Sequence, residues 1–361
     1  MKRLSRVRNN APESVLVVQT AFIGDVLLIV PLLRAAKQFW PDANLDVMVR
    51  PPGDNLLETL PYVNEIIVYD KYGGDRGVSG FAKVLKRLHS RSYDLALLPH
   101  RSLRSGLLAF LSGIPRRVGF NRGGGRFFHT KSIPYPKQVH EIPRNLILLD
   151  PFGTVPPPEP PEIVSTEEDV ERVNGKLDVA SGSKLIALAP GSVWLTKRWP
   201  EESYIRLGER LAEENYRIVL IGGAEDKSLS ARIAAALGED CLDLTGQLTL
   251  RQSVEVLRRC EMLITNDSAP THLGVAAGTR VLTIFGSTLP EFGFAPFGPN
   301  GRALGTDLYC RPCTDHGRQR CPEKHLRCLK DLTPERVFEE ARDMMAKMSL
   351  RVSGHGSADS S

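Results

Sequence analysis

The sequence predicts an α/β protein with parallel sheets arranged in two domains. Short apolar, β-branched runs recur along the 361 residues and alternate with amphipathic segments long enough to form helices. This alternation is typical of parallel sheets, whose strands are connected through helices. Residues 151–161 include six prolines, a composition typical of an extended, semi-rigid link. We therefore expect one domain over 1–160 and a second over 161–335.

In the first half, apolar runs alternate with helical patterns. The predicted strands are 14–19, 45–49, 66–69, 95–98 and 117–119. The predicted helices are 25–40, 56–60, 80–89 and 105–111. Pro41 and Asp42 are expected to end the first helix, because proline interrupts helical hydrogen bonding.

The second half repeats this pattern. Its predicted strands are 184–189, 217–221, 261–265 and 281–285. Its predicted helices are 201–215, 228–237, 250–259, a small-residue helix that begins near Asp267, and 333–348. We assign residues 336–361 to a terminal helix and a polar, disordered tail.

The two halves differ in charge. Residues 1–160 contain 22 Lys and Arg against 13 Asp and Glu, whereas the remainder contains 25 against 29. The basic half suggests a partner that is anionic, and the candidates are a phosphorylated ligand, lipid headgroups and nucleic acid. A merely solvated surface is the alternative. Nucleic acid is disfavoured, because the chain shows no recognisable nucleic-acid module.

The apolar stretch 14–33 follows a basic start and imitates a signal peptide or membrane anchor. Gln19, Thr20, Gly24 and Asp25 interrupt it, and an aspartate at the centre of a bilayer costs about 2.5–3.5 kcal/mol. No other stretch approaches about 18 uninterrupted apolar residues. We expect a cytoplasmic protein without a membrane span.

Residues 265–287 carry the strongest functional signal. A strand leads into a polar turn, and a small-residue helix and a second buried strand follow. Asp267, Ser268 and Ala269 lie where the helix begins, and free N–H groups with a positive dipole end can hold a diphosphate there. His272 lies about one helical turn further on, on the same side.

Two other turns in the second half follow predicted strands. In the loop 190–200, Ser192, Thr196 and Lys197 have the side chains to reach phosphate oxygens, although the Walker spacing is absent. An ordinary solvated loop is the alternative. Glu225 follows two glycines at a strand end, where a carboxylate can accept hydrogen bonds from ribose hydroxyls. A plain turn capped by Asp226 is equally compatible with this segment.

The first half offers one carboxylate and several arginines. Asp25 follows a strand at a helix start, where it is either a general base or a helix cap. Gly24 allows a ligand to approach the backbone closely. Arg101 and Arg104 are predicted to share one helix face, and Arg122 follows nearby. Their clustering favours an anion site over a solvated basic face.

The four cysteines Cys310, Cys313, Cys321 and Cys328 lie within nineteen residues, interleaved with histidines. Structural zinc and disulfides are both compatible with this cluster, and a cytoplasmic location argues against stable disulfides. The chain lacks an Asp-x-Asp pair for a nucleotide-bound metal. It also lacks Gly-x-Gly-x-x-Gly, which disfavours a dinucleotide oxidoreductase.

Several of these motifs resemble glycosyltransferase family 9. They are Gly-Asp-Val-Leu at 24–27, the arginine-containing segments 101–108 and 114–120, Thr-Lys-Arg-Trp-Pro at 196–200 and Asn-Asp-Ser-Ala-Pro-Thr-His-Leu at 266–273. The resemblance covers roughly residues 14–348. Within the family, the cysteine segment at 310–334 is similar to that of the second type of ADP-heptose:lipopolysaccharide heptosyltransferase.

The resemblance implies a GT-B fold, in which two Rossmann-like domains face a central cleft. It also implies inverting heptose transfer without a required metal cofactor. Asp25 would then deprotonate the acceptor, and Lys197 would neutralise the departing diphosphate. The implied donor-binding residues are Ser192, Thr196, Glu225, Asp267, Ser268, Ala269 and His272. The implied acceptor-binding residues are Gly24, Arg101, Arg104 and Arg122.

The implied partners are an ADP-sugar and an anionic lipid A-core acceptor, met at the inner face of the inner membrane. Two alternatives remain open. In the first, the chain is another family 9 transferase with a different donor or acceptor. In the second, it is a nucleotide-sugar-binding scaffold without turnover.

Overall fold

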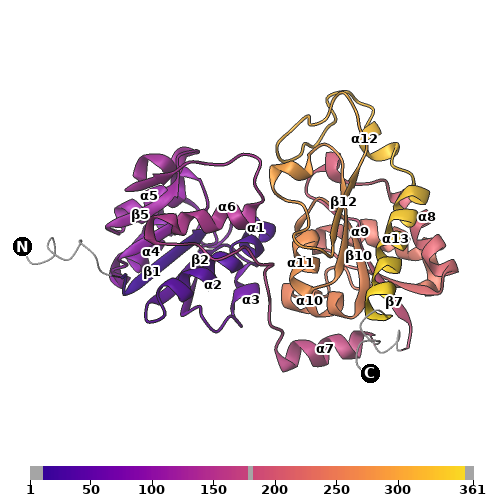
Figure 1. Cartoon of the computed structure of the whole chain (residues 1–361), viewed down its shortest axis with the longest axis horizontal. Helices are drawn as coiled ribbons and strands as arrows, with labels where there is room; N and C mark the ends of the chain where they lie inside the picture. The colour runs from indigo at the N-terminus through magenta and orange to yellow at the C-terminus, as the bar shows by residue number, and fades with distance from the viewer. Residues whose placement is uncertain (1–10, 178–181, 354–361) are drawn as a thin grey trace, which may run out of the picture. The chain divides into compact units, whose positions relative to one another are not determined.

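The computed structural model describes residues 11–177 and 182–353 and divides the chain into two compact units, 1–164 and 165–361. Figure 1 shows the elements of each unit. The expected boundary at 160/161 lies close to the division between them. Residues 354–361 of the expected tail lie outside the described residues.

Unit 1 is built on a six-stranded sheet with the order β3-β2-β1-β4-β5-β6, and all neighbouring strands are parallel. The strands are β1 (Ser14–Gln19), β2 (Asn44–Val49), β3 (Glu65–Val68), β4 (Leu95–Leu98), β5 (Arg116–Phe120) and β6 (Lys131–Ile133). The central strand β1 is buried from Val15 onward, as its uninterrupted apolar run requires in a sheet covered on both faces.

The helices of unit 1 connect these strands. They are α1 (Ile23–Leu28), α2 (Val30–Phe39), α3 (Asp54–Leu57), α4 (Gly77–Arg91), α5 (Leu103–Leu111) and α6 (Glu141–Leu146), with short 3₁₀ turns η1 (Gly124–Phe128) and η2 (Ile147–Phe152). The prediction of a single helix over 25–40 was wrong, because the helix is interrupted at Ile29 and forms α1 and α2. Pro31 has no N–H to donate to the carbonyl of Leu27, so one helix ends and another begins.

Unit 2 repeats the architecture with the parallel order β12-β11-β10-β7-β8-β9. Its strands are β7 (Lys184–Ala189), β8 (Tyr216–Leu220), β9 (Cys241–Asp243), β10 (Cys260–Asn266), β11 (Arg280–Phe285) and β12 (Gly301–Gly305). Its longer helices are α7 (Glu167–Leu177), α8 (Glu201–Glu213), α9 (Lys227–Leu237), α10 (Leu250–Arg258), α11 (Ala269–Ala277) and α13 (Pro334–Ser353). Short turns are η4 (Leu195–Lys197), η5 (Ala224–Asp226), η6 (Gly238–Asp240), η7 (Pro290–Phe292) and α12 (Arg327–Lys330).

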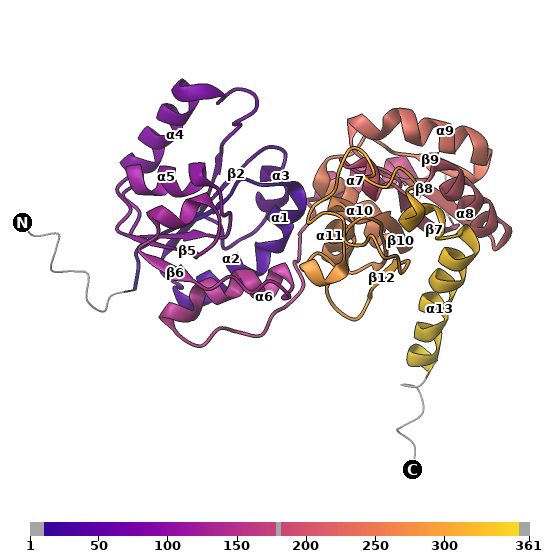
Figure 2. The same cartoon turned by 90° about the horizontal axis from the view of Figure 1, so that it is seen from above.

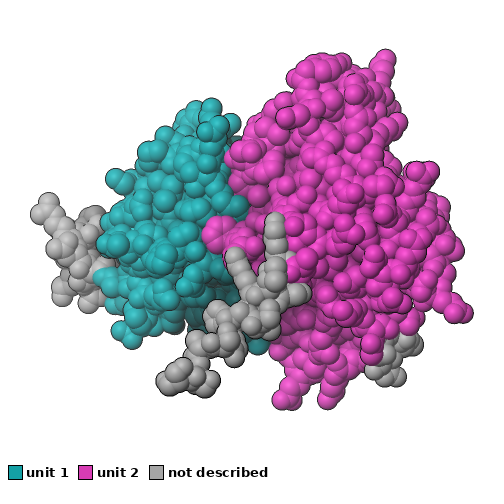
Figure 3. All heavy atoms as spheres, turned by 45° about the vertical axis from the view of Figure 1, so that its right-hand side comes forward, with its two compact units in different colours: residues 1–164 teal, residues 165–361 magenta. Residues whose placement is uncertain are grey.

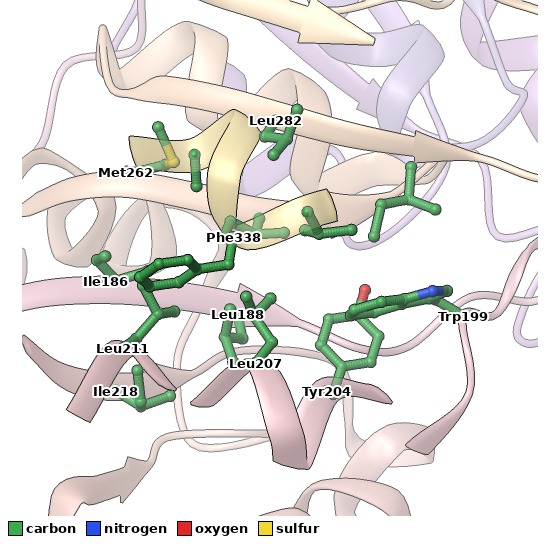
Figure 4. Packing of buried hydrophobic residues seen from close by; sticks show 14 of the residues in the cluster. Ile186, Leu188, Trp199, Tyr204, Leu207, Leu211, Ile218, Met262, Leu282 and Phe338 are labelled. Atoms are coloured by element: carbon green, nitrogen blue, oxygen red, sulfur yellow. The ribbon is translucent and has the colours of Figure 1, made fainter. Parts of the chain in front are cut away.

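Helix α13 completes the second unit by packing against α8, and both views show the two helices side by side (Figures 1 and 2). Phe338 of α13 packs in a buried cluster that includes Leu211 of α8 and Trp199 (Figure 4). The Trp199 indole donates to the carbonyl of Leu332 at 2.9 Å, which ties the start of α13 to this core. Figure 3 colours the two units separately.

Within residues 11–177 and 182–353, no helix has both the length and the apolar character needed to cross a bilayer.

Candidate functional site

Most of the predicted site residues follow the central strands of the two sheets, whereas Arg122 and Glu225 follow β5 and β8. In each sheet the direction of winding reverses at the central strand pair, β1 with β4 in unit 1 and β7 with β10 in unit 2. Parallel α/β sheets bind ligands beyond the carboxyl ends of their strands at such switch points. Asp25 and Arg101 follow β1 and β4, and Lys197 and Asp267 follow β7 and β10. Each unit therefore carries a candidate site of its own.

Asp25 lies in the first turn of α1, three positions after the residue Phe22 that caps the helix. Its Oδ2 accepts a hydrogen bond from the Phe22 N–H at 3.1 Å. Burial, with a smaller contribution from nearby Glu141, raises the pKa of Asp25 to about 6. The Phe22 N–H and Arg101 act in the opposite direction. Asp25 thus caps the helix and also has a pKa suited to a general base working near neutral pH.

Arg101 does not share a helix face with Arg104, so that prediction was wrong. Helix α5 begins at Leu103 with Ser102 as its cap, which leaves Arg101 in the preceding loop. The Arg101 guanidinium lies 4.3 Å from the centre of the Tyr135 ring, whereas Arg104 donates to the Tyr69 hydroxyl at 3.3 Å. The two arginines therefore serve different parts of the surface.

Arg122 joins Arg101 on Tyr135, with its guanidinium 5.4 Å from the ring centre. A cation over an aromatic face is stabilised by the ring quadrupole and keeps its hydrogen-bond donors available. Gly24 is buried beside Asp25. Arg101 and Arg122 thus provide two cations that both contact the Tyr135 ring.

A basic residue that the sequence analysis missed also lies near the end of β1. Lys71 donates to the carbonyl of Thr20 at 2.7 Å, and burial together with Arg50 and Arg104 lowers its pKa. The Thr20 hydroxyl is 3.0 Å from Nδ1 of His100, whose pKa burial lowers to about 4. His100 is therefore neutral at physiological pH.

In unit 2, Lys197 and Asp267 form a buried ion pair. The Lys197 ammonium lies 2.7 Å from Oδ2 of Asp267, and the side chains are only 12% and 7% exposed. The Thr288 hydroxyl donates to the same carboxylate oxygen at 2.6 Å. A desolvated cation held in a fixed place beyond β7 and β10 can stabilise negative charge on a ligand.

Helix α11 begins directly after this ion pair. Ser268 is its cap residue, makes no side-chain capping bond, and is followed by Ala269 and Pro270 in the first turn. His272 is buried in the next turn, with its ring centre 6.4 Å from that of Phe294. The predicted small-residue helix is confirmed, and its positive end lies next to Lys197 and Asp267.

The Thr196 hydroxyl is engaged inside the protein rather than free for a ligand. It lies 2.9 Å from the Ser287 hydroxyl and accepts from the Arg318 N–H at 2.9 Å, while the Thr196 N–H donates to the Arg318 carbonyl at 3.1 Å. Ser192 is buried too, and its hydroxyl accepts weakly from the Trp194 N–H at 3.4 Å. We therefore assign Thr196 to holding the loop that carries Lys197.

Glu225 is exposed in η5. Its neighbour Asp226 is buried and accepts from the Gly223 N–H at 3.2 Å, so Asp226 caps the turn. A side chain at Gly191 would lie 2.2 Å from the Asp226 carboxylate, so only glycine fits there. This contact brings the loop after β7 beside the turn that carries Glu225.

The four clustered cysteines lie close together. They share a small cavity with His325, and Cys310 Sγ is 4.0 Å from His325 Nε2. All described cysteines are free thiols, and burial raises the pKa of Cys328 to about 11. Among the described residues, no group of three or more His, Cys, Asp or Glu side chains is arranged to hold a metal ion. Structural zinc stays a prediction, and no step below uses it.

Known proteins resemble this chain in sequence and in fold. The model of glycosyltransferase family 9 (heptosyltransferase) matches residues 81–326. This chain belongs to glycosyltransferase family 9. Lipopolysaccharide heptosyltransferase 2 of Escherichia coli K12 is 28% identical to this family 9 chain over 352 residues, which cover 92% of the chain and 98% of that protein.

Two solved structures have the same fold as this family 9 protein. The E. coli ADP-heptose LPS heptosyltransferase II superposes with a TM-score of 0.77 at 26% identity, covering 93% of this chain and 99% of that one. A family 9 glycosyltransferase from Veillonella parvula gives a TM-score of 0.84 at 22% identity, covering 93% and 98%. The chain therefore has a GT-B-like fold of two Rossmann-like units and is a glycosyltransferase.

Proposed function

We propose that this protein transfers heptose from ADP-heptose to the inner core of lipopolysaccharide, as a heptosyltransferase of the second type. The names of its relatives support the donor and the acceptor. The observation that carries the chemistry is Asp25, a carboxylate with a pKa near 6 beyond the central strand of unit 1. Because transfer requires an acceptor hydroxyl to lose its proton, we assign Asp25 as the general base.

Lys197 is assigned to the leaving group. As the ADP phosphates gain negative charge, its ammonium and the N-terminus of α11 stabilise that charge. Asp267 pairs with the ammonium and holds it in a fixed position. We assign Asp267, Ser268, Ala269 and His272 to the donor site and Glu225 to the ribose.

The reaction is proposed to invert the anomeric centre in one displacement, with Asp25 as base and the acceptor hydroxyl as nucleophile. A lysine in place of a metal-binding Asp-x-Asp pair supports a mechanism that needs no metal. The arginines Arg101, Arg104 and Arg122 carry the charge needed for acidic sugars or phosphates of the acceptor.

We propose that the protein acts in the cytoplasm, peripherally on the inner membrane. In unit 1, the exposed apolar side chains Leu103, Phe110 and Phe127 lie on α5 and η1, which pack against each other. The guanidinium of Arg126 lies 4.5 Å from the Phe127 ring centre. Apolar side chains among cations are suited to a surface of anionic lipids.

The proposal is tested by assaying transfer from a panel of ADP-, UDP- and GDP-sugars to defined lipid A-core acceptors. We expect turnover with ADP-heptose and a heptose-acceptor core. Turnover with another pair alone would instead favour a different family 9 transferase. Tight ADP-sugar binding with no transfer to any acceptor would favour a non-catalytic scaffold.

A further inference from the structure

We propose that Glu141, held by Arg144 and Tyr135, is a positioning residue that keeps Asp25 a competent base. This inference rests on the proposed role of Asp25. Glu141 itself is not assigned to contact substrate.

Helix α6, which carries Glu141, is fastened to α1, which carries Asp25. The buried Asn145 amide donates to the Leu28 carbonyl at 3.2 Å, near the end of α1. Since both helices are short, this bond fixes the first turn of α6 relative to the first turn of α1.

Arg144 fixes the Glu141 carboxylate in turn. The Arg144 side chain is fully buried, forms an ion pair with Glu141 and donates to the carbonyls of Pro136 at 2.9 Å and Lys137 at 3.0 Å. Its guanidinium also lies 4.6 Å from the centre of the Tyr135 ring. The Tyr135 side chain hydrogen-bonds to Glu141.

Arg101 approaches the Tyr135 ring as well, at 4.3 Å. Asp25, Glu141 and Arg101 thus form one charged cluster of two carboxylates and a cation, in which Arg101 interacts with both carboxylates. Two nearby carboxylates oppose each other's ionisation, whereas Arg101 and the Phe22 N–H favour it. Burial is the main reason that the pKa of Asp25 is raised, and Glu141 adds to it by opposing the two groups that lower this pKa.

The other helix against α1 adds no competing charge. On α2, Arg34 binds Glu159 and Glu162, and Lys37 donates to the carbonyl of Ala43. The charged side chains that act on Asp25 are therefore Glu141 and Arg101, beside the backbone N–H groups of Phe22 and Asp25.

The test measures the pKa of Asp25 directly, by ¹³C NMR of carboxyl-labelled aspartate in the full-length protein, with Asp25→Asn to assign the signal. In Glu141→Gln we expect this pKa to fall by about one unit, because one negative neighbour is lost. The acid limb of the kcat profile should move to lower pH by the same amount. Glu141→Asp, which keeps the charge, should restore both values.

Glu13→Gln is the matched control, since it removes one exposed carboxylate from the same unit. It should leave the pKa of Asp25 unchanged. If Glu141→Gln does not fold, Tyr135→Phe is used in its place. Loss of the Tyr135 hydroxyl raises the pKa of Glu141 and so reduces the negative charge on its carboxylate. The pKa of Asp25 should then fall, by less than in Glu141→Gln. An unchanged pKa in the folded Glu141 or Tyr135 variant overturns the inference, as does an equal shift in Glu13→Gln.

The two proposals fail separately. Normal transfer by Asp25→Asn would refute the base assignment whatever the NMR titration shows. Loss of transfer in Asp25→Asn, together with an Asp25 pKa that ignores Glu141, would refute only the role of Glu141.

Discussion

At the scale of single residues, Asp25 and Lys197 are held in opposite ways. Burial is the main factor that disfavours the charged form of Asp25, whereas the Lys197 ammonium is paired with Asp267 at 2.7 Å. A base benefits from a raised pKa, and an electrostatic stabiliser benefits from a charge that is always present. The sequence predicted that Asp25 follows a strand at a helix start and that Lys197 lies in a loop after a strand, as the structure has them. Glu141 could not be predicted, because only the packing of α6 on α1 brings it near Asp25.

The raised pKa of Asp25 predicts a cost in stability. Its folded pKa of about 6 lies above the ordinary value of 3.8, so ionisation penalises the folded state fully above pH 6, and the penalty disappears as pH falls below 3.8. Asp25→Asn should therefore be more stable than the wild type at pH 8, by about 1–3 kcal/mol, and similar to it at pH 3.5. Thermal melting at both pH values checks this. Equal melting temperatures at pH 8 would contradict the buried-charge account.

Lys197→Ala should lower kcat/KM by about 10²-fold, because the departing diphosphate loses its cation. The variant also leaves the Asp267 carboxylate without its ammonium partner, which weakens binding of the donor phosphates. Steady-state kinetics check the effect. Lys184→Ala is the control, since Lys184 is exposed at the start of β7 in the same unit. Similar kinetics for both variants would remove Lys197 from the mechanism.

At the scale of elements, the central strands and the edge strand β3 were predictable, whereas the edge strands β6, β9 and β12 were not. Strand β1 is a continuous apolar run, so its bounds at Ser14–Gln19 follow from the sequence. The edge strands β6 and β12 are short and partly exposed, so they show no apolar pattern. Loop contacts escaped prediction as well, because they join residues far apart in the chain.

One such contact joins the cysteine-rich segment to the loop that carries Lys197. Thr196 bonds to both Arg318 and Ser287, Gln319 donates to the Val193 carbonyl at 2.9 Å, and Trp194 meets His316 with ring centres 5.4 Å apart. The cysteine-rich segment therefore supports one wall of the proposed donor site, whether or not it binds a metal.

Thr196→Val should accordingly weaken ADP binding as well as stability. It removes the acceptor for the part-buried Arg318 N–H, and such a hydrogen bond contributes about 0.5–1.5 kcal/mol. Calorimetric titration with ADP and hydrogen exchange over residues 311–320 check the effect, and exchange there should speed up. The control is Thr279→Val, which removes a buried bond to the Leu257 carbonyl elsewhere in unit 2. ADP affinity that falls equally in both variants would contradict a specific supporting role.

At the scale of the whole molecule, the chain repeats one architecture twice and divides the proposed roles between the copies. Unit 1 carries the excess of basic residues and most of the exposed large apolar side chains, and unit 2 carries the buried Lys197 ammonium and the α11 N-terminus. Two units were predictable because charge balance and the proline-rich link mark them in the sequence, and the division of roles between them stays a prediction. How the two parts meet during transfer stays a prediction.

The proposed membrane surface predicts binding to vesicles of anionic phospholipid. The full-length protein should cosediment with them at low salt, bind zwitterionic vesicles weakly and dissociate as ionic strength rises. Phe127→Ala should reduce cosedimentation severalfold, because an exposed aromatic anchor is lost. Tyr309→Ala, an equally exposed aromatic change in unit 2, should have no effect. Equal binding by both variants would place the contact elsewhere.

The proposed mechanism depends most directly on Asp25 removing a proton from the acceptor. The decisive measurement compares transfer of heptose from ADP-heptose by wild type and Asp25→Asn at pH 8, with ADP affinity measured in parallel by calorimetry. The account predicts that transfer falls by about 10²-fold or more while ADP affinity is retained. Transfer at nearly the wild-type rate by a folded, ADP-binding Asp25→Asn protein would contradict it.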